Sequence, residues 1–104
     1  MAFSTISQQY SDKIDSFPYL QGFGAPQQGF IAGNVRDDKI NYNSLAEVQR
    51  AAMKNPECTG FTSLPKGGWR LRVADSVKIN ATSIRNMDVS FLKLAYHPRQ
   101  TDDL

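Results

Sequence analysis

Between Asn43 and Arg72, the spacing of apolar and polar residues predicts a helix followed by a β-hairpin. Ser44 and Glu47 have the spacing of a capping box, in which each side chain accepts from the other residue's amide. The following apolar residues recur at helical spacing on one stripe, namely Leu45, Val48 and Ala52. Asn55-Pro56 ends the pattern, because proline cannot continue the helical hydrogen bonds. We therefore expect a helix that begins after Ser44 and ends near Asn55.

The hairpin is predicted by two β-type runs, Cys58–Leu64 and Trp69–Val73, on either side of the turn Pro65-Lys66-Gly67-Gly68. Side chains alternate along a strand, so one face of the second run carries Trp69, Leu71 and Val73. Its other face carries Arg70 and Arg72. If the helix covers the Leu71 face, the two arginines point outward about 7 Å apart.

Apart from turns, four further elements are predicted outside this unit and before the final strand. Phe3, Ile6, Tyr10 and Ile14 have helical spacing, which indicates a short N-terminal helix, with a strand and loop as the alternative. Proline is tolerated where a strand begins, so Phe17–Leu20 is a possible strand start, and Gly22–Pro26 is a turn. The last two are the strands Gln28–Val35, with a bulge or bend at Gly33-Asn34, and Val77–Ile79, to which Ile84 adds.

The final strand, Val89–Ala95, is apolar enough for the middle of a sheet. Asn80-Ala81-Thr82 has the form of a glycosylation acceptor, but we interpret it as a chance match in a turn. The elements together predict an α+β domain with one helix packed on a mainly antiparallel sheet of about five strands. We place this single domain at residues 1–96 and a polar tail at residues 97–104.

Composition limits the class of protein. The chain has 104 residues, of which 40% are hydrophobic and 11% aromatic, as expected for one globular domain. It has no apolar run of about 20 residues and no secretory signal at its start. Cys58 is the only cysteine, so no internal disulfide can form. We expect a soluble cytoplasmic protein without a membrane partner, with non-classical secretion as the alternative.

Charge is distributed unevenly, although the net charge is only +2. Residues 59–95 contain two acidic residues, Asp75 and Asp88, and a larger basic group: Lys66, Arg70, Arg72, Lys78, Arg85 and Lys93. Such an excess is typical either of a surface that binds an anionic partner or simply of a solvated face. Both interpretations stay open at the level of sequence.

The order of these motifs resembles the PAN/apple family. The resemblance covers about residues 29–93 and rests on Ser44–Glu47, Asn55–Thr62, Gly68–Leu71 and the closing run Val89–Lys93. It implies a non-catalytic fold that binds proteins or carbohydrates. Members of that family tie the helix to the Cys58 strand by a disulfide, whereas the matching helix position here is Ala52. The resemblance therefore implies a lone thiol packed under the helix.

Catalysis and metal binding lack the residues they need. The only histidine, His97, lies in the tail, so Cys58 has no evident base. One cysteine and one histidine are too few for a zinc site. Asp37, Asp38 and the asparagines up to Asn43 offer oxygen ligands, but they lack the glycine and the distal glutamate of a calcium loop. We expect no enzyme activity, no cofactor and no metal.

The hairpin is the predicted binding surface, with five candidate ligand-binding residues: Lys66, Trp69, Arg70, Arg72 and Asn80. Guanidinium forks suit anionic groups, and an exposed Trp69 would stack on a sugar ring, although a core position for Trp69 is favoured. The first hypothesis is a lectin-like carbohydrate-binding module. The alternative is a protein-interaction, inhibitor or adhesion domain that contacts an acidic protein surface. Nucleic-acid binding is the weakest class, because aromatic and basic residues are not interleaved. Agglutinating activity would require a homo-oligomer.

Overall fold

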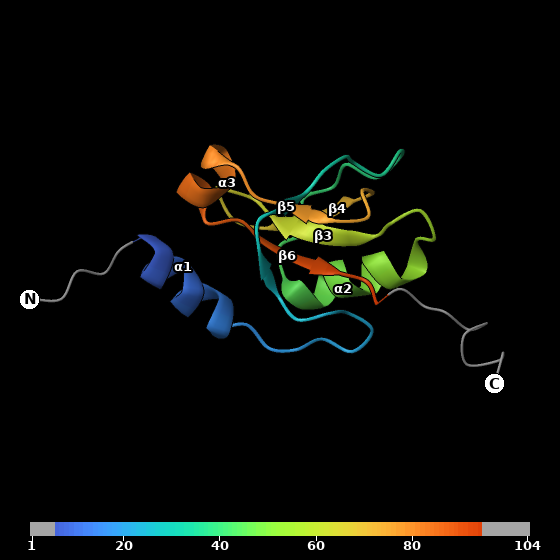
Figure 1. The fold of residues 1–104 in the computed structure, drawn as a ribbon. Coiled ribbons are helices and arrows are strands. Elements are labelled where there is room, and N and C mark those ends of the chain that lie inside the picture. Colours follow the sequence, from blue (N-terminus) through green and yellow to red (C-terminus); the bar gives the residue numbers. More distant parts are fainter. Residues whose placement is uncertain (1–5, 95–104) are drawn as a thin grey trace, which may run out of the picture.

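The computed structural model describes residues 6–94, which form three helices and six short strands (Figure 1). In chain order these are α1 (Ile6–Asp15), β1 (Gln27–Gln28), β2 (Phe30–Ile31), α2 (Leu45–Lys54), β3 (Gly60–Ser63), β4 (Trp69–Arg72), β5 (Val77–Lys78), α3 (Ala81–Asn86) and β6 (Val89–Leu92). The predicted α+β class is confirmed. The strands, however, number six and form two sheets rather than one sheet of about five, and α1 and α3 accompany the one helix expected to pack on the sheet.

The larger sheet is antiparallel, in the order β1-β6-β3-β4. Phe61 at its centre lies opposite Leu71 of β4 and Phe91 of β6. The next residue, Thr62, lies opposite Arg70 and Ser90. Alternation therefore gives this sheet one apolar face and one polar face. The predicted hairpin and the central position of the last strand are both present.

Helix α2 covers the apolar face by packing against β3 and β4 (Figure 1). It begins where predicted, because the Ser44 hydroxyl accepts from the Glu47 amide at 3.1 Å. Its inner stripe, Val48 and Ala52, is fully buried, as is Phe61 beneath it. Aromatic rings fill the rest of this core, with Phe61 stacked on Phe91 at 5.2 Å between ring centroids. Burial of this cluster is the main stabilising contribution on this side of the sheet.

The polar face is covered by a small second sheet, in which β2 pairs with β5, and by α3 (Figure 1). Here hydroxyl groups replace apolar packing. The Ile31 amide donates to Thr62 Oγ1 at 2.9 Å, Thr62 Oγ1 lies 2.8 Å from Ser90 Oγ, and Ser90 Oγ donates to the Gly29 carbonyl at 2.7 Å. The chain of bonds satisfies two buried hydroxyls, so this face tolerates polar residues at its centre.

Gly29 divides the predicted strand Gln28–Val35 between the two sheets. Its φ is +119°, a region that strains any residue with a Cβ. A Cβ there would also lie 2.4 Å from the Lys78 carbonyl oxygen. The chain therefore pairs with β6 before Gly29 and with β5 after it. The expected single strand is wrong for this reason.

Helix α3 was not predicted, since Asn80-Ala81-Thr82 was interpreted as a turn and Ile84 as part of a strand. Asn80 instead caps the helix: its side-chain oxygen accepts from the Ser83 amide at 2.8 Å, and Ser83 Oγ accepts from the Asn80 amide at 2.9 Å. This reciprocal pair is a capping box. Met87, at φ 51°, then ends the helix in the left-handed conformation.

Helix α1 confirms the helical alternative for the N-terminal pattern, although Phe3 lies outside the described residues. Its buried Tyr10 hydroxyl donates to the Asp88 carbonyl and accepts from the Gly29 amide at 2.7 Å. Lys13 Nζ donates to the Met87 carbonyl at 3.0 Å. These bonds attach α1 to the segment between α3 and β6. Residues 17–20 form no strand and instead place Phe17 against the core.

No helix within residues 6–94 is long and apolar enough to span a bilayer. The predicted tail at 97–104 and the end of the last predicted strand at Ala95 lie outside the described residues.

Candidate functional site

Arg70 and Arg72 lie together on the sheet face opposite α2, as alternation predicts. Both side chains are half-buried, and each is oriented by an asparagine from the segment before α2. Arg70 Nε donates to Asn41 Oδ1 at 3.1 Å, and Arg72 Nη1 donates to Asn34 Oδ1. The two guanidinium groups are therefore held in place rather than free in solvent.

Trp69 lies on the other face and belongs to the core. Its side chain is 8% exposed, and its ring centroid lies 5.4 Å from that of Phe61 and 5.6 Å from that of Phe17. The favoured core interpretation is confirmed. The role of Trp69 as a stacking platform for a sugar is corrected, because the ring has no face open to a ligand.

Lys66 is exposed in the hairpin turn and borders no cavity together with the arginines. Gly67 beside it has φ +103° and open space around it, so the turn projects into solvent. Lys66 therefore lies on an exposed turn, away from the hollow that Arg72 lines.

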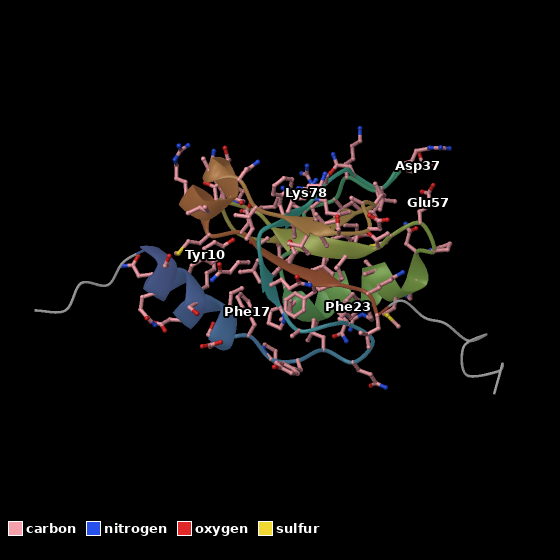
Figure 2. The ribbon with its side chains drawn as sticks, viewed as in Figure 1. Tyr10, Phe17, Phe23, Asp37, Glu57 and Lys78 are labelled. Carbon is pink, nitrogen blue, oxygen red and sulfur yellow. The ribbon has the colours of Figure 1, made fainter. Side chains whose placement is uncertain are left out.

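Arg72 and Asn80 do come together, in a cavity of about 320 Å³ on the polar side of the sheet. Its walls come from β2, the β3–β4 hairpin, α3 and the residue before β6. The lining residues are Phe30, Thr62, Ser63, Leu64, Pro65, Arg72, Asn80, Thr82, Ser83 and Asp88. Figure 1 shows α3 and β5 above the sheet on this side, and Figure 2 shows Lys78 of β5 pointing away from α2. We call this hollow the Arg72–Asp88 cavity.

Two buried polar atoms in this cavity's walls have no hydrogen-bond partner. They are Arg72 Nε and Asp88 Oδ1, the only such side-chain atoms within residues 6–94. Asp88 as a whole is 9% exposed. A donor and an acceptor left without partners are costly in a folded protein, so their presence in one cavity requires an explanation.

Burial perturbs both charged groups. It raises the pKa of the Asp88 carboxyl, against the smaller opposing effects of Lys13 and Arg72. It lowers the pKa of the Arg72 guanidinium, and the neighbouring Arg70 lowers it further. In each case the loss of hydration outweighs the attraction between the two opposite charges. The pair therefore retains unmet hydrogen-bonding capacity.

Sequence reasoning missed Asp88, Thr62 and Phe30. Asp88 is a lone acid between a short polar helix and an apolar strand, and only the tertiary structure shows that it lines the same cavity as Arg72. A capping-box search that included Asn-x-x-Ser would have found α3 and so brought Asn80 and Asp88 close in space.

The other hollows described within residues 6–94 hold no buried side-chain polar atom without a partner. A larger groove of about 740 Å³ runs between α2 and residues 38–43, the segment considered for calcium. There the Asp38 carboxylate already accepts from the Ile40 amide and from the Tyr42 hydroxyl, and burial together with this bond raises the pKa of Tyr42 to about 12. No group of three or more potential ligands for a metal occurs in the described part of the chain.

Cys58 is a buried core thiol. Its side chain is 2% exposed, its sulfur donates to the Gly60 carbonyl at 3.0 Å, and burial raises the pKa of the thiol. A thiol in this state is a poor nucleophile.

Comparisons of this chain with protein families, with curated proteins and with solved structures find no match.

Proposed function

We propose that this protein is a small, non-catalytic carbohydrate-binding module whose ligand enters the Arg72–Asp88 cavity. The observation that carries the proposal is the pair of buried, unpartnered polar atoms in the cavity walls. Ligand sites place a few polar groups among apolar walls, and a volume of about 320 Å³ lies at the small end of their range. One sugar unit is a ligand of that scale.

The lining residues support a sugar in particular. A hydroxyl group both donates and accepts, so sugar hydroxyls can satisfy Arg72 Nε and Asp88 Oδ1. Phe30 is half-buried in the wall and can pack on the apolar face of a ring. Asn80 adds an amide donor, because its cap bond uses only the side-chain oxygen.

We infer that the serine hydroxyls of the cavity do not act as nucleophiles. Ser63 Oγ accepts from the Val89 amide, and Ser83 Oγ is engaged with the Asn80 backbone. A nucleophile needs a base within hydrogen-bond reach, and neither serine has one among the described residues. The resemblance to the PAN/apple family remains a hypothesis that points to the same kind of binding function.

A second candidate function, binding to an acidic protein surface, is favoured by Lys66 and Arg70. Both lie on or next to the hairpin outside the cavity, where a flat partner can reach them. Such a partner would use the exposed charges rather than the buried atoms. The two functions therefore depend on different residues of the same hairpin.

A glycan array probed with the wild type and three variants tests the proposal. Arg72→Gln should weaken binding to the glycans that the wild type binds on the array. The expected loss is about tenfold or more, which is usual for a hydrogen bond to a charged group. Arg50→Gln removes the same charge from the exposed surface of α2, so it should change nothing. Equal loss in Arg72→Gln and Arg50→Gln would indicate nonspecific charge, and loss in Lys66→Gln but not Arg72→Gln would move the glycan site from the cavity to the exposed hairpin turn.

A further inference from the structure

We propose, building on the function above, that the Arg72–Asp88 cavity selects neutral sugars and holds two adjacent ring hydroxyls between the Asp88 carboxylate and the Arg72 guanidinium. One hydroxyl donates to Asp88, and its neighbour accepts from Arg72. Neither the choice of neutral ligands nor a role for Asp88 follows from the arginine-rich hairpin alone.

The charges of the cavity lining favour a neutral ligand. Arg72 and Asp88 are the only charged residues that line the cavity, so its fixed charges cancel. A sulfate or carboxylate placed against Arg72 would also face the buried Asp88 carboxylate, and like charges at close range are strongly unfavourable where water is excluded. A neutral hydroxyl pair meets both groups without this repulsion.

Asp88 lacks a hydrogen-bond partner that a ligand hydroxyl can supply. Two cations are close enough to affect its pKa, yet neither forms an ion pair with it in the described structure: Lys13 Nζ donates to the Met87 carbonyl instead, and Arg72 Nη1 donates to Asn34. A purely structural aspartate would bond to one of them. Asp88 remains buried with an acceptor oxygen unused, which is the arrangement that a ligand donor completes.

Access to the two atoms requires only a local movement. Both atoms are covered by neighbouring groups, while their residues border the cavity. Neither atom has a hydrogen bond of its own to break, but a rotation of the Arg72 side chain also exchanges the bond from Nη1 to Asn34 Oδ1 for the bond to the ligand. The ligand bond formed in the dry wall is charge-assisted and correspondingly strong.

The experiment compares three probe sets on immobilised wild type: neutral oligosaccharides, the same sugars with adjacent hydroxyls methylated, and sulfated oligosaccharides of equal length. The variants are Asp88→Asn, which keeps the shape, and Arg72→Lys, which keeps the charge but loses the planar fork. Asp75→Asn, an exposed acid between β4 and β5, is the matched control. Thermal midpoints of all variants are measured alongside.

Neutral sugars should bind, methylation should abolish binding, and Asp88→Asn should weaken it by about 10- to 100-fold without lowering the thermal midpoint. Arg72→Lys should weaken it as well, and Asp75→Asn should not. A preference for sulfated sugars that becomes stronger in Asp88→Asn would overturn the proposed binding of neutral sugars between Asp88 and Arg72. It would leave the glycan-binding function standing. A lower thermal midpoint in Asp88→Asn would also overturn this proposal, because it would show that Asp88 stabilises the fold. Absence of binding to all three sets overturns both proposals.

Discussion

Asp88 is a buried charge without a hydrogen-bond partner on one oxygen; within residues 6–94 only Arg72 Nε shares this condition, and the other buried polar side-chain atoms are satisfied. Thr62 and Ser90, for example, complete each other's hydrogen bonds on the same face of the sheet. Domains are only marginally stable, so an unsatisfied carboxylate is a measurable cost. Such costs are typical of binding sites, where the ligand supplies the missing bond.

The first prediction is that Asp88→Asn stabilises the unliganded protein at neutral pH. Burial raises the pKa of Asp88 above its value in the unfolded chain, about 3.9, so the folded state binds this proton more tightly. The contribution of Asp88 to stability is therefore fully present below about pH 4 and is lost as pH rises through the folded pKa. Asparagine does not ionise and avoids that loss.

Thermal midpoints measured between about pH 3 and pH 8, a range that spans the titration of carboxyl groups, test the direction of this pH dependence. The advantage of Asp88→Asn over the wild type should grow with pH and vanish in acid. Asp75→Asn, which replaces an exposed carboxylate, is the matched control. A variant less stable than the wild type at neutral pH would mean that attraction to Lys13 and Arg72 outweighs burial.

At the level of residues, the sequence predicted half of the site. Alternation along β4 placed Arg70 and Arg72 on the same outward face, because strand geometry is local. The same rule placed Trp69 inward, where it is buried. Asp88 could not be predicted, since its place in the same cavity as Arg72 depends on how α3 returns the chain to β6. A lone acid has no local pattern that reveals its burial.

Among the elements, the two capped helices contribute differently. Helix α2 packs on the apolar face and lines no part of the Arg72–Asp88 cavity, whereas α3 and its N-cap residue supply three of the cavity's lining residues, Asn80, Thr82 and Ser83. Both helices begin with a side-chain oxygen that accepts from an amide three residues on. Their caps are therefore similar in local energy but different in position.

The second prediction compares Ser44→Ala with Asn80→Ala. Each should lower the free energy of unfolding by about 1 kcal/mol, the usual cost of losing an N-cap side chain. Only Asn80→Ala should also weaken glycan binding, because it loosens a wall of the cavity. Asn80→Ser keeps a good cap and should restore most of the stability. Denaturant titration and the glycan-binding assay together measure both effects.

Equal losses of binding in Ser44→Ala and Asn80→Ala would contradict the separation of the two faces. A change in Ser44→Ala too small to resolve would count against the start assigned to α2.

The elements that sequence predicted well are those with complete local signals. Helix α2 had a capping residue, an apolar stripe and a proline, and the hairpin had two glycines between β-type runs. The failure at Gln28–Val35 has a physical cause: Gly29 turns the chain between sheets, and the close approach of the Lys78 carbonyl that requires a glycine exists only in the fold. Helix α3 is six residues long, too short for a clear periodic pattern.

Over the whole molecule, the basic residues of the second half do not gather on one surface. Arg70, Arg72 and Lys78 belong to the side opposite α2, but Lys93 Nζ donates to the Asn55 carbonyl at the end of α2. That carbonyl follows the last turn of the helix, where a cation is favourable. The excess of positive charge in the sequence is thus divided between a candidate site and a structural role.

The third prediction follows from this division and from the net charge of +2. Polyanion binding releases counterions, so its affinity falls with salt by a log–log slope of roughly −0.9 for each phosphate contact. Two arginines on phosphates would give a slope of about −2. A neutral sugar in a cavity whose charges cancel releases no counterions, so its slope should be close to zero.

Affinity measured by calorimetry at several salt concentrations gives the slope directly, and Arg70→Gln, which leaves the cavity intact, should not alter it. A slope of about −1 or steeper that Arg70→Gln reduces would instead assign the hairpin to a polyanionic partner.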